Sequence, residues 1–151
     1  MPDNFAAGTH IFIASSAESS VIALDTCDST ANWRAFASAP VRIAPTFESG
    51  KVYFGSAPWE ASYLSCVDAD SGSEQYKTTL SLGNTLSAIV CHSDAHAVLA
   101  TPSTYHFLVK DKIRAVSRSN GATQWLAILE GANTLAMGGT TLFVGGSNRI
   151  T

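Results

Sequence analysis

The stretch Cys66–Tyr76, CVDADSGSEQY, decides the fold because related stretches lie on either side of it. They are ALDTCDSTANW at Ala23–Trp33 and AVSRSNGATQW at Ala115–Trp125. Each copy begins with a small residue, has Asp or Ser two positions later, and carries a large aromatic eight residues after that. Turn-forming residues fill the space between. A short strand, a polar turn and a second strand led by an aromatic is the pattern of a β-hairpin.

A second motif, a short apolar run that ends in small residues, precedes each hairpin and occurs once more near the end of the sequence. Its copies are IFIASS (Ile11–Ser16), VYFGSA (Val52–Ala57), VLATPS (Val98–Ser103) and LFVGGS (Leu142–Ser147), which begin 41, 46 and 44 residues apart. Such runs are typical of buried strands. Weaker apolar runs precede the last three copies, at 41–47, 86–91 and 134–137.

Together the motifs predict four strands in each repeat. In the middle repeat we expect them at Arg42–Phe47, Lys51–Gly55, Tyr63–Asp68 and Glu74–Leu80. Four short antiparallel strands per repeat of about 40–50 residues describe a β-propeller blade, so the predicted class is all-β. The predicted domain is an incomplete propeller over 1–151, with units at approximately 10–40, 41–84 and 85–131 and a fourth that starts at 132–151.

The hairpin residues resemble the quinoprotein-type (PQQ-like) propeller repeat, whose pattern is Ala-x-Asp-x-x-Thr-Gly-x-x-x-Trp. The positions that correspond to this pattern and that we predict to be structural are Ala23, Asp25, Trp33, Cys66, Asp68, Gly72, Tyr76, Ala115, Gly121 and Trp125. The chain departs from the pattern at several places. Asp28 and Ser29 stand for Thr-Gly in the first copy, and Ser117 stands for Asp in the third.

The resemblance implies that each hairpin aromatic docks against Gly and Ala of a neighbouring blade. A Trp or Tyr buries a large apolar area and can donate its N–H or O–H to a backbone carbonyl, while small residues leave room for the ring. We therefore expect Trp33, Tyr76 and Trp125 to be mostly buried between sheets. We expect Trp59, which lies in a loop between strands, to be more exposed.

Composition excludes several classes of protein. Apolar residues make up 46 % of the 151 residues and charged residues only 14 %, which argues against disorder. A net charge of −3 does not predict a nucleic-acid partner, and no apolar run is long enough for a transmembrane helix. The N-terminus lacks the basic region of a signal peptide, and three widely spaced cysteines predict neither disulfides nor a zinc site. These features favour a reducing compartment such as the cytoplasm.

Three polar clusters in the sequence are candidates for binding sites. The run Asp68–Glu74 fails the spacing of a calcium loop, so Asp68 is predicted to accept N–H groups of its own turn while Gly72 supplies a positive φ. The run Cys91–His96 alternates metal-capable side chains, but the repeat places its centre in a turn, and we prefer a solvated turn to a metal site. The basic side chains predicted to lie on a solvated hairpin, without stacking aromatics for nucleic acid, are Lys110, Lys112, Arg114 and Arg118.

The resemblance leaves two functions open. One is a non-catalytic scaffold or protein-interaction module, because family members include a lipoprotein that helps assemble outer-membrane β-barrels. The other is a fragment of a quinone-dependent alcohol or sugar dehydrogenase. Such enzymes hold quinone and calcium inside a full ring, and many have adjacent cysteines, which this sequence lacks. We predict no catalytic residue, cofactor or metal. We also expect the chain to self-associate or to sit in a longer polypeptide, because about three blades fall short of a closed ring.

Overall fold

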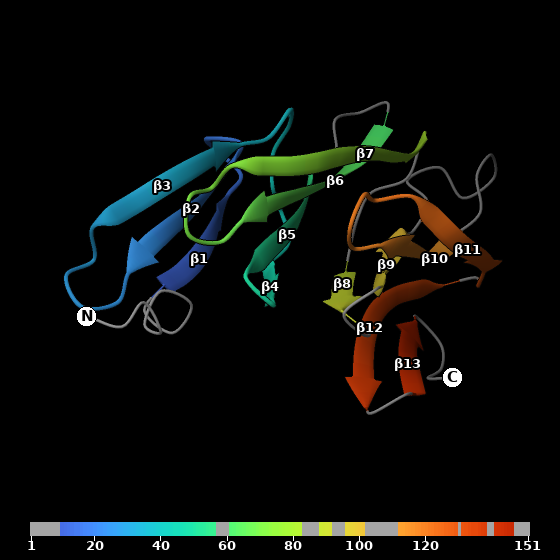
Figure 1. The fold of residues 1–151 in the computed structure, drawn as a ribbon. Helices are drawn as coiled ribbons and strands as arrows, with labels where there is room; N and C mark the ends of the chain where they lie inside the picture. The colour runs from blue at the N-terminus through green and yellow to red at the C-terminus, as the bar shows by residue number, and fades with distance from the viewer. Residues whose placement is uncertain are drawn as a thin grey trace.

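The computed structural model describes residues 10–56, 61–82, 88–91, 96–101, 112–129, 131–138 and 141–146. Within these ranges the chain is all-β, and its strands form antiparallel sheets that follow one another along the chain (Figure 1). Strand bounds are β1 His10–Ser15, β2 Ser20–Asp25, β3 Ala31–Phe36, β4 Thr46–Glu48, β5 Lys51–Ser56, β6 Ala61–Asp68, β7 Glu74–Leu82, β8 Ala88–Cys91, β9 His96–Thr101, β10 Lys112–Ser117, β11 Thr123–Ile128, β12 Ala132–Gly138 and β13 Thr141–Gly146.

The sheets repeat one topology. The second and third sheets each hold four strands in the spatial orders β4-β5-β6-β7 and β11-β10-β9-β8. The first sheet has the order β1-β2-β3, and the fourth sheet pairs β12 with β13 within the described residues. All neighbours are antiparallel, as expected for propeller blades. The predicted all-β propeller fold is therefore confirmed for the described part of the chain.

The predicted strands of the middle repeat are confirmed, except for the first. That strand was expected at Arg42–Phe47, but β4 covers only Thr46–Glu48. Pro45 accounts for the difference, since proline has no N–H for a ladder hydrogen bond and restricts the residue before it. The segment 41–45 instead places Val41 in the core between the first and second sheets.

The three hairpin turns close in the same way. The N–H of residue 29, 72 or 121 bonds to the carbonyl of the residue four positions earlier, at 2.8–3.0 Å. Each of these residues has a positive φ: 60° at Ser29, 71° at Gly72 and 73° at Gly121. A register shift follows Ala23, Cys66 and Ala115, so the aromatic-bearing strand is bent at the same place in every copy.

The hydrophobic core lies between successive sheets. Val21 and Ala35 of the first sheet pack with Val52, Phe54 and Val67 of the second. The cluster between the second and third sheets contains Tyr53, Leu64, Cys66, Ile89 and Val116. Ile113 and Ala115 of the third sheet pack with Ala132 and Val144 of the fourth. Because the second and third sheets each contribute to a core on both faces, and the first and fourth to a core on one face, adjacent sheets stabilise one another.

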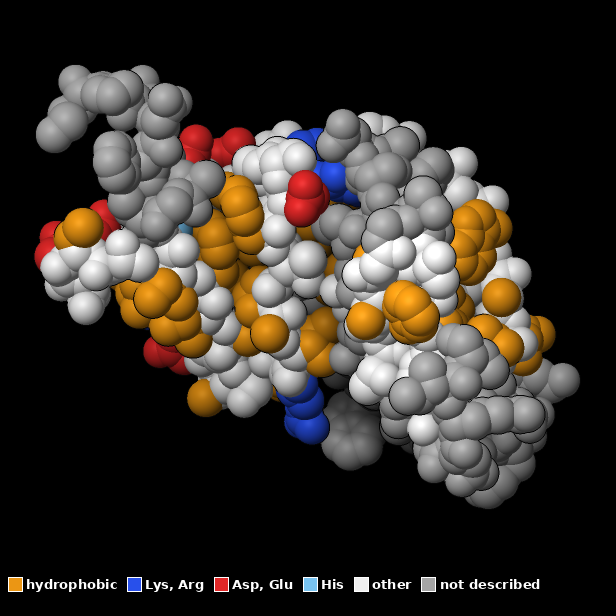
Figure 2. Space-filling view, turned by 90° about the horizontal axis from the view of Figure 1, so that it is seen from below, with side chains coloured by type: hydrophobic (Ala, Val, Ile, Leu, Met, Phe, Trp, Pro, Cys, Tyr) orange, Lys and Arg blue, Asp and Glu red, His pale blue; other side chains and the backbone are white. Residues whose placement is uncertain are grey.

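On the face seen in Figure 2, the described residues carry few charges, and hydrophobic side chains reach the surface in several places. Large exposed apolar residues occur at both ends of the row of sheets. They include Ile11, Ile13 and Phe36 in the first sheet and Trp125, Leu126, Ile128 and Phe143 in the last two. No helix that could span a membrane occurs in the described ranges.

Candidate functional site

The candidate site is the contact between a hairpin aromatic and the turn of the next sheet. At the first junction, Trp33 of β3 donates its indole N–H to the carbonyl of Ala69, at 2.8 Å. Its ring lies against Gly72, where an added Cβ would come within 2.7 Å of ring atom Cδ2. Phe12 of β1 packs beside it, with ring centroids 5.7 Å apart. Glycine is therefore favoured at position 72 for two reasons: its backbone has a left-handed φ, and the Trp33 ring leaves no room for a Cβ.

The second junction repeats this contact with a tyrosine. An added Cβ at Gly121 would lie 2.8 Å from the Tyr76 ring and would also meet the hydroxyl of Thr78. The Tyr76 hydroxyl reaches the carbonyl of Ser117 at 3.4 Å, a longer bond than the one that Trp33 makes. Trp33 and Tyr76 are both partly buried, with their polar atoms directed at the backbone of the next sheet.

Trp125, the third aromatic, is 45 % exposed, so the expectation that it is mostly buried was wrong. The cause lies in the sheet that follows. Trp33 and Tyr76 are covered by the β6–β7 and β10–β11 hairpins, whereas the described part of the fourth sheet holds only β12 and β13. The ring of Trp125 thus has no turn above it within the described residues. Trp59 lies outside the described residues.

The first residue of each motif faces its aromatic directly. Ala23 pairs with Trp33, Cys66 with Tyr76, and Ala115 with Trp125. Ala23, Cys66 and Ala115 are all buried. A small side chain is needed here because it shares one sheet face with a large ring and with the neighbouring sheet.

In the first two hairpins the turn is held by the side chain at the Asp position, Asp25 or Asp68. Asp68 accepts the N–H groups of Asp70 and Ser71 through one oxygen, at 3.1 and 2.9 Å, which confirms the predicted role of Asp68 as a turn acceptor. Hydrogen bonds from the Ser71 backbone and hydroxyl hold the pKa of Asp68 below its usual value. Asp25 accepts the N–H of Cys27 at 2.7 Å in the first copy. Thr30 bonds to Asp28 through its hydroxyl and N–H and lowers the pKa of that carboxyl as well.

A buried cation, Arg118, lies at the second junction, where the sequence predicts a solvated side chain. Arg118 is only 4 % exposed. Its Nε donates to the Tyr53 hydroxyl at 2.9 Å, and Nη2 donates to the carbonyl of Glu48 at 3.0 Å. The prediction that Arg118 is solvated was therefore wrong. The guanidinium reaches from the turn of the third sheet into the second sheet, whose Tyr53 ring centroid lies 5.6 Å away.

Burial also shifts the pKa values of Cys66 and Arg114. Cys66 lies in the core beside Tyr53, and burial raises the pKa of its thiol, an effect that Lys51 and the nearby hydroxyls offset in part. The thiol stays protonated at neutral pH and is a poor nucleophile. Burial lowers the pKa of Arg114, which donates to the Thr123 hydroxyl at 3.2 Å.

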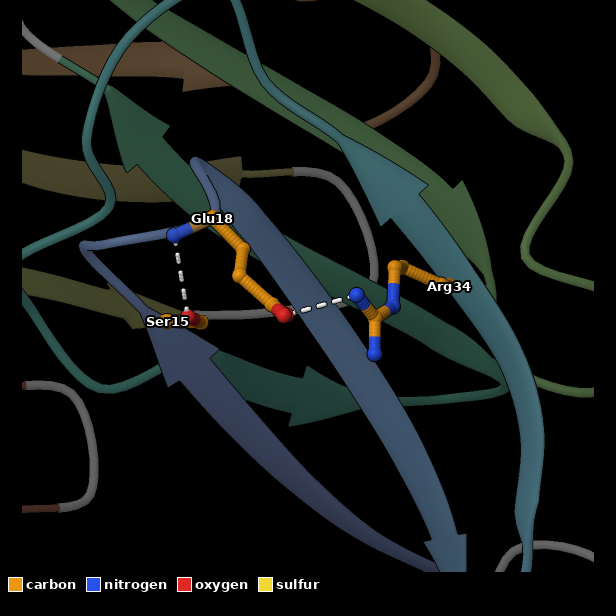
Figure 3. Close-up of polar contacts among 3 residues, drawn as sticks. All are labelled: Ser15, Glu18 and Arg34. Atoms are coloured by element: carbon orange, nitrogen blue, oxygen red, sulfur yellow. Dashed lines mark hydrogen bonds and ion pairs between the residues drawn. The ribbon is translucent and has the colours of Figure 1, made fainter.

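The described residues contain no group of three His, Cys, Asp or Glu side chains that could hold a metal ion. Of the Cys91–His96 run, residues 92–95 lie outside the described residues, as does Lys110. An open groove of about 570 Å³ runs beside β1 and is lined by Phe12, Ile13, Ala14, Ser16 and residues 41–45. Among the described residues that line the groove, Arg42 is the one with a charged side chain, so this part of the lining offers no acid–base pair. The ion pair of Arg34 with Glu18, whose N–H bonds to Ser15, closes an exposed turn of the first sheet (Figure 3).

Successive antiparallel sheets joined through docked aromatics define a β-propeller built from PQQ-like repeats. The family model described as outer membrane protein assembly factor BamB matches residues 4–125. The chain therefore belongs to this family. No curated protein matches the chain in sequence.

Solved structures share the fold at low sequence identity. BamB from Moraxella catarrhalis superposes with a TM-score of 0.72 at 14 % identity, over 91 % of this chain and 40 % of its own. The computationally designed Ika4 protein gives a TM-score of 0.72 at 10 % identity, over 95 % of this chain and 83 % of its own. Quinohemoprotein alcohol dehydrogenase from Comamonas testosteroni gives 0.62 at 18 % identity, over 80 % and 19 %. The chain thus spans less than half of the BamB structure that it matches.

The aromatic–glycine contact predicts a difference between two glycine substitutions. Gly72→Ala and Gly50→Ala both place a Cβ at a φ above 70°, which costs about 1–2 kcal/mol. Only at Gly72 does the new Cβ meet a ring, because nothing lies within 4 Å of the Cβ position at Gly50. Gly72→Ala should lower the free energy of unfolding by about 1–3 kcal/mol more than Gly50→Ala, as measured by urea titration. Equal losses would show that Trp33 adapts freely.

The Arg118 contact predicts a cost for removing one hydroxyl. Tyr53→Phe leaves the buried Nε of Arg118 without that acceptor and should lower the free energy of unfolding by about 1–3 kcal/mol. Tyr63→Phe is the control, since Tyr63 is only partly buried with the exposed Lys77 over its ring, and its loss of a hydroxyl should change stability by about 0.5 kcal/mol or less. Thermal and urea unfolding measure both variants. A Tyr53→Phe chain as stable as the wild type would mean that the guanidinium finds another acceptor.

Proposed function

We propose that this chain is a non-catalytic propeller segment that acts as a scaffold and holds other polypeptide segments against its exposed sheet surfaces. The observation that carries the proposal is Trp125, a docking aromatic that is 45 % exposed while Trp33 and Tyr76 lie against the turns of the next sheets. Phe143 of β13, 47 % exposed, adds to the apolar surface of the same end. Exposed aromatics of this kind are enriched where proteins bind one another.

The proposal extends to the organisation of the chain. We take residues 1–151 as one propeller domain, with units at approximately 10–40, 41–84, 85–131 and 132–151, because the cores between sheets tie each unit to the next. The ten repeat positions, from Ala23 to Trp125, serve these contacts rather than a reaction. Their chemistry supports this role, since they comprise small residues, turn formers and docking rings.

The structural likeness to BamB and to the quinohemoprotein alcohol dehydrogenase supports a propeller as the framework of the proposed scaffold. We favour the scaffold because the described surface offers neither a metal-binding cluster nor a paired acid and base in its groove. Protein binding is thus proposed from the exposed aromatic surface itself.

Site-specific photo-cross-linking of the protein in living cells tests the scaffold role. A photo-reactive benzoylphenylalanine in place of Trp125 should form a covalent adduct with another polypeptide segment on irradiation. The same residue in place of Leu126 is the control, because this neighbour is exposed and lies in the regular part of the β10–β11 ladder, where alternation places its side chain on the opposite face of β11. Gel electrophoresis and mass spectrometry identify the adduct. An adduct pattern that is equal at both positions would contradict the proposed interaction surface.

A dehydrogenase assay tests the alternative. The chain, supplied with pyrroloquinoline quinone and calcium, should not reduce a redox dye with a panel of alcohols and sugars, because the described lining of its groove holds no acid–base pair. Dye reduction is followed against a heat-denatured sample. Saturable turnover above that control would replace the scaffold with an oxidoreductase fragment.

A further inference from the structure

The turn of the third hairpin contains an asparagine that is directly followed by glycine, Asn120–Gly121. The other asparagines of the chain, at positions 4, 32, 84, 133 and 148, are followed by Phe, Trp, Thr, Thr and Arg. Glycine is the residue that least hinders attack of its own nitrogen on a preceding side chain, because it has no Cβ and its backbone is permissive. Asn120 is exposed, so solvent reaches this residue. The step is therefore the place in the chain where an asparagine side chain cyclises most easily.

The cyclisation forms a bond within the turn and ends in deamidation. The Gly121 nitrogen attacks the carbonyl carbon of the Asn120 side chain, and the proton of its N–H passes to a base in the solvent. The bond from that carbon to the amide nitrogen breaks, and this nitrogen leaves as ammonia. Water then opens the succinimide ring at either of its two carbonyls, which leaves aspartate or isoaspartate at position 120.

In the closed turn both reacting groups are held in other contacts. The Gly121 N–H donates to the carbonyl of Ser117 at 2.8 Å, so the attacking nitrogen is engaged across the turn. The Asn120 Oδ1 accepts the N–H of Ala122 at 2.9 Å, which fixes the orientation of the carboxamide. Gly121 is also buried, with the Tyr76 ring packed on it. Cyclisation therefore requires the turn to open first.

The side chain at this position has the same structural role in each of the three hairpins. Its oxygen accepts the N–H two residues later: Asp28 from Thr30 at 2.9 Å, Ser71 from Ser73 at 3.3 Å and Asn120 from Ala122 at 2.9 Å. An aspartate at position 120 can keep this bond, as Asp28 does in the first hairpin. An isoaspartate cannot, because the backbone then runs through the former side chain and is one carbon longer within the turn.

We propose that Asn120 is a site of spontaneous deamidation that the closed turn protects, and that isoaspartate formation there weakens the contact between the second and third sheets. Arg118, two residues earlier in the same turn, connects the two events because it crosses to Tyr53 and to the carbonyl of Glu48. A turn that cannot close no longer holds this guanidinium in the second sheet. The inference goes beyond the proposed function, since the reaction consumes water and needs no partner.

Peptide mapping by mass spectrometry, combined with enzymatic labelling of isoaspartate, measures the reaction. The full chain is incubated folded and, in parallel, unfolded in guanidinium chloride. We expect Asn120 to react at least about tenfold faster in the unfolded chain than in the folded one, and at least about tenfold faster than any other asparagine of the unfolded chain. Asn120→Gln is the matched control, because it keeps the carboxamide but must form a larger ring, and it should abolish the isoaspartate label.

A second measurement tests the consequence for the fold. Chains that carry isoaspartate at position 120 are separated, refolded and compared with Asn120→Asp, which has the same added charge on an unaltered backbone. The isoaspartyl chains should unfold at a lower denaturant concentration, or fail to refold where Asn120→Asp refolds. A rate in the folded chain that equals or exceeds the rate in the unfolded chain, faster conversion of another asparagine, or isoaspartyl chains as stable as Asn120→Asp would overturn the inference.

Discussion

The contact between an aromatic ring and the turn glycine of the next sheet is the constraint on which the structure depends. A single sheet of three or four short strands cannot bury both of its faces, so it needs a neighbour on each side. Trp33 and Tyr76 fix the position of each sheet relative to the next, because each ring packs directly on a turn glycine that has no side chain. With the turn in this position, the apolar faces of the two adjacent sheets pack against each other and form a hydrophobic core at each junction.

The turn itself must be rigid for this contact to form. Asp68 fixes it by accepting two backbone N–H groups and the Ser71 hydroxyl, and the left-handed φ at Gly72 directs the turn toward the ring. Both features arise within the hairpin, whereas the ring arrives from the previous sheet. Local hydrogen bonds thus prepare a surface that long-range packing then uses, which is why motif spacing is retained even where residue identities differ.

Much of the fold could be predicted because it is encoded in such local patterns. Strand and turn positions in the middle repeat followed from alternating apolar runs and the Asp–Gly turn, and Pro45 shortened the one strand that was misplaced. The burial of Arg118 could not be predicted, because the residue sits in an exposed-type turn and its acceptors, Tyr53 and Glu48, lie 65 and 70 residues earlier. Trp125 was misjudged for a related reason: a repeat motif specifies the ring but not whether a turn covers it.

The first junction, where Trp33 meets the second sheet, and the second junction, where Tyr76 meets the third sheet, are packed with different side chains. At the first, Trp33 fills the space and bonds to Ala69, and Phe12 stacks on Phe47 of β4 with centroids 5.7 Å apart. At the second, the smaller Tyr76 makes a longer bond, and Arg118 stands at the position of Ala69 and reaches back to Tyr53. Tyr53 occupies the strand position of Phe12, so an aromatic–cation contact replaces an aromatic–aromatic one. The smaller ring of Tyr76 is thus compensated by the larger Arg118 side chain across the same interface, which keeps the interior closely packed.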